Sequence, residues 1–431
     1  MKKRKEQLIA ESLPLVAIDF GSSKIRVMAA EQVSSERLHI LGVEESDRYV
    51  CVERGVITQT SNAAFMMGEC LRLLANRIGY SELPTAFVSV GGLSTQICEV
   101  SAKRDQVRAK TIARSLLDEM ENECRLKIEE HYPQLTVLGL IPSFFVLDGQ
   151  EQDYSPEATQ RAVLVEGHYI AFVAQKRVGE QLQKVFDQAG KSIEKSFIRQ
   201  DALLSAFASE DGFWVVQEGC ALIDFGAQTT TLSVCKENQY LFHKVYKWGG
   251  DDITQRIANK GISLATAEQL KRQFGYASEQ FVEKNQRLRI KAMPAVGGEI
   301  SISTAELAQL ISGELDEQIA PMMEQINNFA NRIRTVYITG GASMLQGLDA
   351  YLQDKTSVQV IYGAHDKLID DEQYDEPTYS ALVGTLLMGA DYREEHKGAK
   401  VPKPGTLKKL EDLALQFFTD AESKVNMDND K

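Results

Sequence analysis

The sequence lacks the features that mark a membrane-spanning or secreted chain. No window approaches the roughly 18 uninterrupted apolar residues of a membrane span, and no apolar stretch of signal-peptide length follows the basic opening MKKRK. Basic residues are outnumbered by acidic ones: the chain has 48 Lys and Arg against 61 Asp and Glu, and its formal net charge is −13. General nucleic-acid binding needs a basic surface, so we expect no nucleic-acid partner.

Cysteine and histidine are equally scarce, with six residues of each. The cysteines form no C-x-x-C pair and the histidines show no paired spacing, so neither set predicts a metal site. We expect the cysteines to be buried free thiols in a reducing cytoplasm. The rest of the composition is ordinary for a globular protein. The 431 residues are 43% hydrophobic and 25% charged, and they suffice for roughly three domain-sized units.

Apolar strand-like segments alternate with amphipathic helical segments along most of the chain. Strands are predicted at 16–19, 85–92 and 335–341, and helices at 60–80 and 378–390. The other predicted elements are a charged helical stretch at 101–131, a strand at 135–149, a strand and helix within 165–190, and helices at 264–275 and 304–329 around a polar middle at 276–303. This alternation predicts an α/β protein with mostly parallel sheets.

Two turns with the same four residues follow two of the apolar strands. VAIDFGSSKIRV at 16–27 and CALIDFGAQTTTLSV at 220–234 each place Ile-Asp-Phe-Gly after an apolar run and before hydroxyl residues. The glycines, Gly21 and Gly226, let backbone N–H groups approach phosphate oxygens without a Cβ in the way. Further phosphate contacts are expected from Ser22, Ser23, Lys24, Thr229 and Thr230. The carboxylates of Asp19 and Asp224, facing each other from two related domains, are predicted to hold Mg²⁺ through water.

A third motif follows in VYITGGASMLQGL at 336–348, where an apolar strand runs into two glycines. In this order after the two turns, it resembles the adenosine-binding motif of the actin, Hsp70 and sugar-kinase superfamily. The resemblance implies ATP as the ligand and places Gly340, Gly341 and Ser343 beside it.

Other segments resemble the connecting motifs of the same superfamily. RQDALLSAFASE at 199–210 resembles the first connecting helix, with Asp201 where relatives carry the Gln or Glu that orients the attacking water. The resemblance thereby gives catalytic roles to Asp201, Asp19 and Asp224. The remaining implied positions are Gly249 and Gly250 in the turn KWGGDDIT (247–254), Lys271 beside the nucleotide base, and Gly384 at the close contact of the second connecting helix (376–389).

Within this superfamily the chain resembles the FtsA family of bacterial cell-division proteins. The likeness rests on LPTAFVSVGGLSTQICEV at 83–100 and LGLIPSFFVLDG at 138–149, which are similar to that family's inserted subdomain. It covers nearly all of 15–390 and implies an actin-like two-lobed ATPase fold with an FtsA-type inserted subdomain. The implied boundaries are 1–84 with 165–205 and 374–395 for the first-lobe core, 85–164 for the inserted subdomain, 206–258 with 305–373 for the second-lobe core, 259–304 for the second-lobe small subdomain, and 396–431 for a linker and terminal helix.

The second turn departs from the family pattern D-I-G-G-G-T-T-D. Ala227 and Gln228 replace glycines, which narrows backbone freedom at the phosphates, and Thr231 replaces a carboxylate near the metal. Ser143 also stands where the family commonly has Gln. We therefore expect at most a slow ATPase.

The chain ends in a linker-like segment, KGAKVPKPG, and an amphipathic segment, TLKKLEDLALQFFTD, at 406–420. One helical stripe of the latter is apolar, which predicts insertion at a lipid interface. The residues expected to contact the membrane are Leu407, Leu410, Leu413, Phe417 and Phe418.

The resemblance implies a recruitment protein that binds ATP with Mg²⁺ and self-associates. It would tether FtsZ filaments to the inner face of the cytoplasmic membrane at the division site, as a peripheral protein, and recruit other division proteins. Two alternatives remain open. One is a pilus-assembly adaptor ATPase of the PilM type, which usually lacks a terminal amphipathic anchor, and the other is a small-molecule kinase of the same fold, which fast transfer to an acceptor would reveal.

Overall fold

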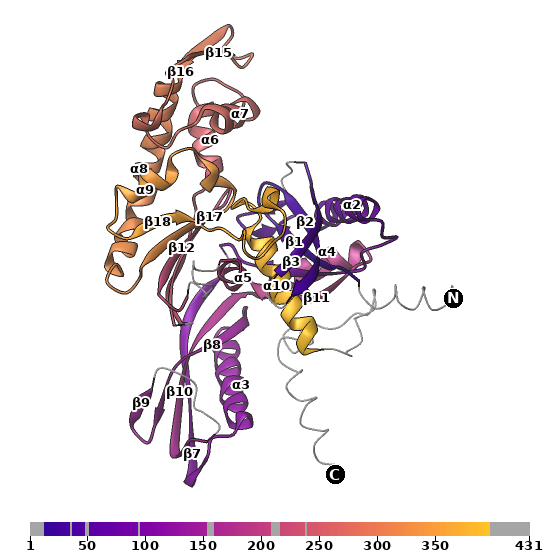
Figure 1. Cartoon of the computed structure of the whole chain (residues 1–431), viewed down its shortest axis with the longest axis vertical. Coiled ribbons are helices and arrows are strands. Elements are labelled where there is room, and N and C mark those ends of the chain that lie inside the picture. Colours follow the sequence, from indigo (N-terminus) through magenta and orange to yellow (C-terminus); the bar gives the residue numbers. More distant parts are fainter. Residues whose placement is uncertain are drawn as a thin grey trace.

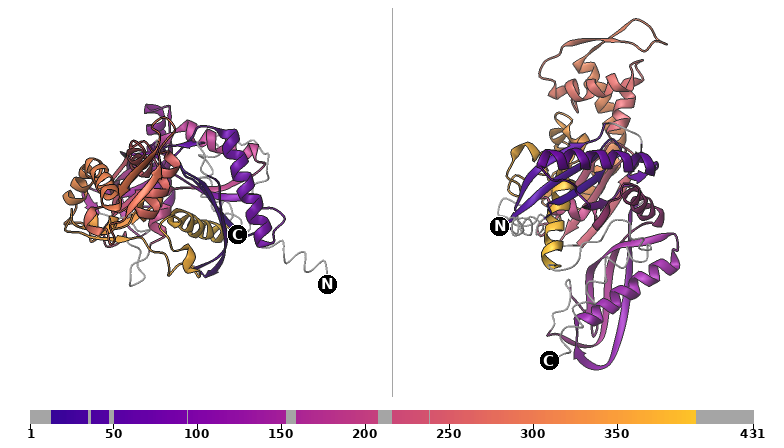
Figure 2. Two further views of the ribbon diagram at one scale, coloured as in Figure 1. Left: turned by 90° about the horizontal axis from the view of Figure 1, so that it is seen from above. Right: turned by 90° about the vertical axis from the view of Figure 1, so that its right-hand side faces the viewer.

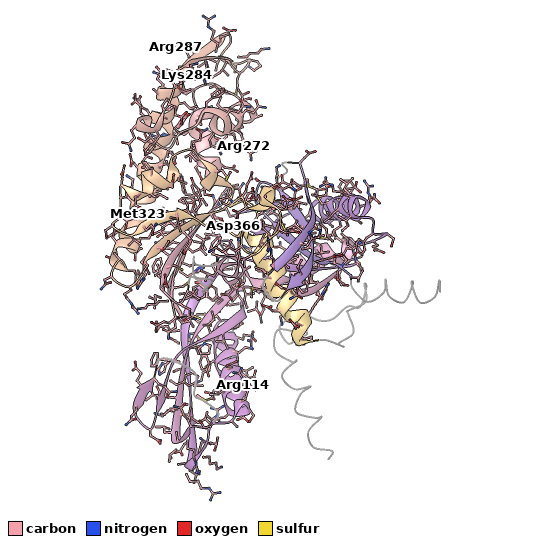
Figure 3. The ribbon with its side chains drawn as sticks, in the orientation of Figure 1. Arg114, Arg272, Lys284, Arg287, Met323 and Asp366 are labelled. Carbon is pink, nitrogen blue, oxygen red and sulfur yellow. The ribbon has the colours of Figure 1, made fainter. Side chains whose placement is uncertain are left out.

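The computed structural model describes residues 13–34, 37–47, 51–93, 95–152, 159–207, 216–237 and 239–396. Its two five-stranded sheets form two lobes side by side, and smaller α/β parts extend from the bottom and the top (Figure 1). Figure 3 marks these extremes by Arg114 in the lower part and by Lys284 and Arg287 in the upper part. The mixed α/β architecture agrees with the prediction from the sequence.

The first-lobe sheet has the strand order β11-β6-β1-β2-β3. Its strands are β1 (Leu15–Phe20), β2 (Ile25–Ser34), β3 (Arg37–Glu45), β6 (Thr85–Val90) and β11 (Ser192–Ile198). Because side chains alternate along a strand, Val16 and Ile18 pack under α2 (Thr60–Ile78) and α4 (Lys176–Gln188), whereas Leu15 and Ala17 pack under α10 (Ser380–Glu395). Figure 2 shows α2 lying across its face of the sheet.

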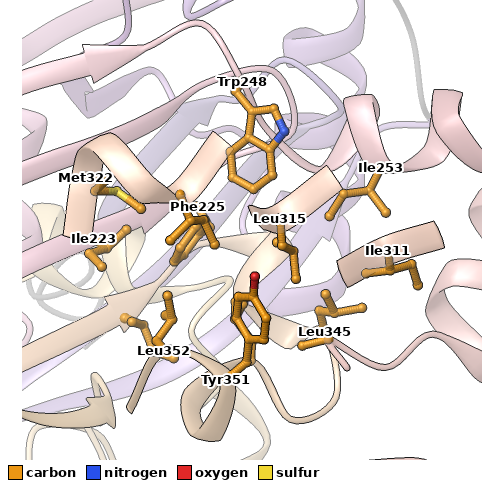
Figure 4. Packing of buried hydrophobic residues seen from close by; sticks show 14 of the residues in the cluster. Ile223, Phe225, Trp248, Ile253, Ile311, Leu315, Met322, Leu345, Tyr351 and Leu352 are labelled. Atoms are coloured by element: carbon orange, nitrogen blue, oxygen red, sulfur yellow. The ribbon is translucent and has the colours of Figure 1, made fainter. Parts of the chain in front are cut away.

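The second-lobe sheet has the order β14-β13-β12-β17-β18 and thus repeats the plan of the first. Its strands are β12 (Cys220–Phe225), β13 (Thr230–Lys236), β14 (Gln239–Tyr246), β17 (Thr335–Thr339) and β18 (Gln359–Tyr362). One face carries the largest apolar cluster, in which Phe225 and Trp248 meet side chains of α8 (Thr304–Asn328) and α9 (Leu348–Gln353) (Figure 4). The other face packs on Leu203 of α5 (Arg199–Ser205) and on Phe207, which follows this helix.

A third sheet, in the order β7-β10-β8-β9, carries α3 (Arg114–His131) on one side. Its strands are β7 (Gln96–Thr111), β8 (Leu135–Leu147), β9 (Gln150–Gln152) and β10 (Arg161–Gln175). The expected helix at 101–131 is therefore wrong over 101–111, which is strand. This segment belongs to β7, the edge strand of the sheet, and its exposed charged side chains, among them Lys103, Asp105 and Arg108, are of a kind that protects an edge from further pairing.

Strand pairing at both ends of the segment 85–164 shows which residues belong to the third sheet. The strand β6, at the start of the expected 85–164 insert, pairs with β1 in the first-lobe sheet. The strand β10 runs beyond residue 164 and pairs with β7 and β8 up to its last residues. The inserted sheet thus spans β7 to β10, because long-range pairing rather than local pattern decides which sheet a strand joins.

The upper part of the second lobe contains α6 (Gly250–Ala258), α7 (Leu264–Phe274) and the hairpin of β15 (Arg287–Lys291) with β16 (Glu299–Ser303). A capping box begins α8, since the Ser303 hydroxyl accepts from the Glu306 N–H and the Glu306 carboxylate accepts from the Ser303 N–H. The short remaining elements are β4 (Val52–Glu53), β5 (Val56–Ile57), η1 (Glu279–Phe281), η2 (Gly341–Met344) and η3 (Glu372–Tyr374). The expected free thiols are present, and five of the six cysteines are buried.

Candidate functional site

A cavity of about 1030 Å³ lies between the two lobes. The hairpin turns after β1 and β12 form two of its walls, and the loops after β6 and β17 with α6 and α7 form the others. Its size is in the range of clefts that enclose a small ligand or cofactor. The cavity is thus built where the two repeated sheets present equivalent turns to each other.

The two hairpins have matching geometry. In the first, Asp19 pairs with Arg26 and Phe20 with Ile25; in the second, Asp224 pairs with Thr231 and Phe225 with Thr230. A Cβ on Gly21 would lie 2.9 Å from the Lys24 carbonyl oxygen, and one on Gly226 would lie 2.8 Å from the Thr229 carbonyl oxygen. Both turns therefore need glycine, and both leave backbone groups at the cavity wall.

The two predicted metal-binding carboxylates do face each other across the cleft. Asp19 and Asp224 are only 5% and 6% exposed, and both hold the guanidinium of Arg199. Arg199 Nη1 donates to Asp19 Oδ1 at 2.6 Å, and its Nε donates to Asp224 Oδ2 at 2.8 Å. Burial lowers the pKa of Arg199, but the charges of the two carboxylates and their hydrogen bonds outweigh it and raise that pKa well above its ordinary value.

Arg199 was not among the residues predicted for the site, although it opens the segment RQDALLSAF. It enters from the first turn of α5, and its side chain lies over Gly91, where a Cβ would come within 2.8 Å of Arg199 Cδ. The sequence signal that could have found Arg199 is a basic residue at the first position of a connecting helix. Its two partners lie 180 and 25 positions away in the chain, so only the fold brings the three together.

The carboxylates accordingly do not fit a metal ion as two open ligands. Two of their four oxygens are hydrogen-bonded to Arg199, and the described residues contain no cluster of three or more His, Cys, Asp or Glu side chains suited to a metal. Asp224 Oδ1 is buried without a hydrogen-bond partner in the described part of the chain. A Mg²⁺ ion at the expected position would have to displace the guanidinium.

The loop after β17 closes the cleft on the second lobe. Thr339 pairs with Asp224, and the next residue, Gly340, has φ of 87°. A Cβ there would lie 2.4 Å from the Phe225 carbonyl oxygen and 2.5 Å from Asp224 Oδ1. The Ser343 hydroxyl donates to the Gly340 carbonyl at 2.7 Å. Ser343 therefore holds the loop in shape and is buried away from the cavity, whereas Gly340 and Gly341 line it.

Lys271 extends from α7 to the first turn of α6. Its Nζ donates to the Gly250 carbonyl and the Thr254 hydroxyl, each at 2.8 Å, and forms an ion pair with Glu268 at 2.7 Å. Both Lys271 and Gly250 line the cavity, and so does Arg272 on the same helix, labelled in Figure 3. Gly249 lies behind this wall, where a Cβ would come within 2.6 Å of the Ala227 backbone.

The cleft also carries a contact between the lobes through Gln228, one of the residues that depart from the family pattern. The Gln228 side-chain carbonyl accepts from the Arg54 N–H at 3.0 Å, and its amide donates to Asp251 at 3.4 Å. Nearby, the Ser22 hydroxyl accepts from the Gly55 N–H at 3.2 Å. A side chain in place of glycine thus ties the second hairpin to the first lobe.

Twelve of the predicted positions line the cavity: Asp19, Gly21, Ser22, Ser23, Lys24, Asp224, Gly226, Thr229, Gly250, Lys271, Gly340 and Gly341. Lys24 is already paired with Glu45 at 2.6 Å. Thr230 is turned away, since its hydroxyl donates to the Trp248 carbonyl at 2.9 Å and it is buried in the lobe. Together with Gly249 and Ser343, Thr230 supports the wall from behind and does not contact the cavity.

The structure does not bring Asp201 into the cavity. Successive helical residues point about 100° apart, so when Arg199 faces the cleft, Asp201 two positions later faces the opposite side of α5. There its carboxylate accepts a hydrogen bond from the Tyr240 hydroxyl at 2.6 Å. Burial raises the pKa of Asp201 to about 6, against the opposing effect of that hydrogen bond. The geometry does not support the expected water-orienting role.

The predicted membrane stripe, Leu407 to Phe418, lies outside the described residues. Among the helices that the structure does describe, none is both long enough and apolar enough to cross a bilayer.

Comparisons with known proteins agree with this architecture. A family model described as cell division protein FtsA matches residues 221–384. The cell division protein FtsA of Streptococcus pneumoniae is 24% identical over 405 residues, which cover 93% of this chain and 84% of that protein. A chain of the PilM–PilN type IV pilus biogenesis complex superimposes with a TM-score of 0.64 at 15% identity, covering 88% of this chain and 99% of that one. MreB5 of Spiroplasma citri, solved bound to ADP, gives a TM-score of 0.53 at 11% identity over 90% of this chain and all of that one.

Two facing sheets with equivalent hairpins around one cleft, and these structural neighbours, define an actin-like ATPase fold. By sequence the chain is similar to the FtsA family of cell division proteins, through the family model over residues 221–384 and through relatives that match most of its length.

Proposed function

We propose that this protein binds ATP in the cleft between its lobes and acts as an actin-like recruitment protein in cell division. The observation that carries the proposal is the pair of glycine turns, each following a buried Asp, that face one cavity of about 1030 Å³. Such turns present backbone N–H groups to phosphate oxygens. The solved relative bound to ADP supports a nucleotide as the ligand of this fold.

The wall residues divide into two groups suited to the two ends of a nucleotide. The hairpin turns with Ser22, Ser23 and Thr229 would hold the phosphates, and the loop at Gly340 with Lys271 would hold the nucleoside. Two buried acceptor or donor atoms on this wall, Ser89 Oγ and Asp224 Oδ1, have no partner in the described part of the chain. Buried polar atoms nearly always have a hydrogen-bond partner, so the lack of a partner for these two atoms supports a bound ligand.

Gly340→Ala is expected to weaken ATP binding about tenfold or more, because a left-handed backbone and a contact of 2.4 Å both oppose a Cβ at this wall. Isothermal titration calorimetry on the two proteins measures the change. Gly297→Ala is the matched control: Gly297 has φ of 73°, but a Cβ there meets nothing within 4 Å, and the residue lies in the β15–β16 loop. If both variants bind ATP as the parent does, the cleft is not the nucleotide site.

We propose that hydrolysis is slow, well below the median enzyme rate of about 10 s⁻¹. Thr231 stands in the cavity wall where the family pattern has a carboxylate, and Asp201 faces away from the cavity. Thr231 itself carries no carboxylate, so the second hairpin lacks the acid that the family pattern has at this position. Fast phosphoryl transfer to a small acceptor would instead favour the kinase alternative.

We further propose that the terminal segment tethers the protein, and FtsZ with it, to the inner face of the cytoplasmic membrane, where self-association adds avidity. The similarity to FtsA proteins and the apolar stripe from Leu407 to Phe418 support this proposal. Other division proteins would be recruited to the same place. The protein would then be peripheral, at the division site.

Phe417→Glu with Phe418→Glu is expected to release the full-length protein from liposomes, because apolar burial supplies most of the binding. Co-sedimentation with vesicles, with and without FtsZ, measures the effect. Lys408→Gln with Lys409→Gln changes the net charge by the same amount on the polar face and should retain binding. The tail is not the anchor if the phenylalanine variant sediments like the parent. A parent that binds vesicles but leaves FtsZ in solution would favour the pilus-adaptor alternative.

A further inference from the structure

We propose that Arg199 is a built-in cation that takes the place of a divalent metal ion between Asp19 and Asp224, so that the cleft binds a nucleoside triphosphate without Mg²⁺. The inference rests on the proposed nucleotide binding and identifies what neutralises the charge in that site. It starts from geometry, because one guanidinium spans the carboxylates of both lobes at 2.6 and 2.8 Å.

The position of the guanidinium is the one that a metal ion would need. Asp19 and Asp224 lie near the ends of the two equivalent strands β1 and β12, and their carboxylates meet at one guanidinium across the cleft. A cation between them must contact both, and Arg199 does so with two separate N–H groups. Two acids buried this deeply need a positive partner, and the chain supplies it.

The side chain of Arg199 is held in this place by its surroundings. Its stem crosses Gly91, the residue at which a Cβ would collide with it at 2.8 Å. Its base is fixed in α5, whose neighbour α10 approaches through Gly384 so closely that a Cβ there would lie 1.6 Å from the Ala202 carbonyl oxygen. The side chain of Arg199 is therefore packed along its stem, and the helix that carries it is packed against α10.

One end of the guanidinium remains available to a ligand. Nη1 and Nε are used by the two carboxylates, whereas Nη2 donates to no residue in the described ranges. The side chain is 20% exposed and lines the cavity. An arginine in this position donates to a phosphate oxygen in a planar, charge-assisted hydrogen bond, and it does so while remaining bound to both acids.

Nucleotide affinity in the presence of excess Mg²⁺ and in excess EDTA separates this arrangement from a metal site. We expect the parent protein to bind a fluorescent ATP analogue equally well in both. Arg199→Gln exposes two facing carboxylates, so it should bind about tenfold or more weakly in EDTA and recover in Mg²⁺, since a charged hydrogen bond is lost and two like charges remain. Arg72→Gln, the same change at an exposed helical pair with Glu69, should behave as the parent does.

A second readout needs no nucleotide. Mg²⁺ alone should raise the thermal unfolding temperature of Arg199→Gln and leave that of the parent unchanged, because only the variant has an open two-acid site. If the glutamine variant fails to fold, Arg199→Lys replaces it in both experiments. Lysine keeps the positive charge but lacks the planar guanidinium that donates to both carboxylates. The inference is overturned if the parent loses nucleotide in EDTA, or if Mg²⁺ stabilises the parent as much as the variant. Absence of nucleotide binding in both buffers, with the Mg²⁺ response of the variant intact, would instead reject the proposed ATP function and leave Arg199 as the cation of this pair.

Discussion

Gly384→Ala is expected to lower the free energy of unfolding by about 3 kcal/mol or more. The added Cβ would lie 1.6 Å from the Ala202 carbonyl oxygen and 2.5 Å from its carbon, so α5 and α10 must separate. A clash with backbone is not relieved by a change of rotamer. Because α5 also carries Arg199, a shift of this helix disturbs the pair of acids in the cleft as well. Urea unfolding followed by circular dichroism measures the loss.

The control for this substitution is Gly68→Ala in α2. Gly68 also lies inside a helix, but a Cβ there meets nothing within 4 Å. Alanine is the better helix former by about 1 kcal/mol, so this variant should be as stable as the parent or slightly more stable. Equal unfolding midpoints for the two variants would contradict the close packing of α5 on α10.

Asp201→Asn is expected to stabilise the protein above pH 7 by on the order of 2 kcal/mol. Burial raises the pKa of Asp201 from 3.8 to about 6 in the folded protein. Between these two values the folded state binds more protons than the unfolded chain, so the stability falls as the pH rises from about 4 to 6 and stays lower above that range. Asparagine carries no charge at either pH and still offers an oxygen to the Tyr240 hydroxyl.

The measurement is the free energy of unfolding of parent and variant near pH 4 and at pH 8. The two proteins should differ at pH 8 and converge near pH 4, and ATP affinity should be the same for both. Asp187→Asn, an exposed acid on α4, should change neither quantity much. A variant that loses nucleotide or turnover without gaining stability would restore the catalytic role that the segment's resemblance implied for Asp201.

The sequence by itself determined the features that depend on neighbouring residues. The strands before Asp19 and Asp224 are continuous apolar runs, and a Gly two positions after each Asp permits the tight turn, so both hairpins were predicted in place. Gly340 was predicted from local sequence in the same way, since its φ of 87° belongs to a turn that directly follows a strand. Local pattern sufficed because each of these features is closed by hydrogen bonds a few residues apart.

Only the tertiary structure decided which of these residues meet. The strand 101–111 was expected as helix because its charges obscure the alternation of a strand, and its pairing with β10 depends on residues fifty or more positions away. On α5, the sequence could place Arg199 and Asp201 on one short helix but not choose the side that faces the cleft. That choice came from the packing of Leu203, and of Phe207 just after the helix, under the second-lobe sheet. This packing turns Asp201 toward Tyr240 and leaves Arg199 to the two acids, because a short helix is rotated so that its apolar side chains are buried.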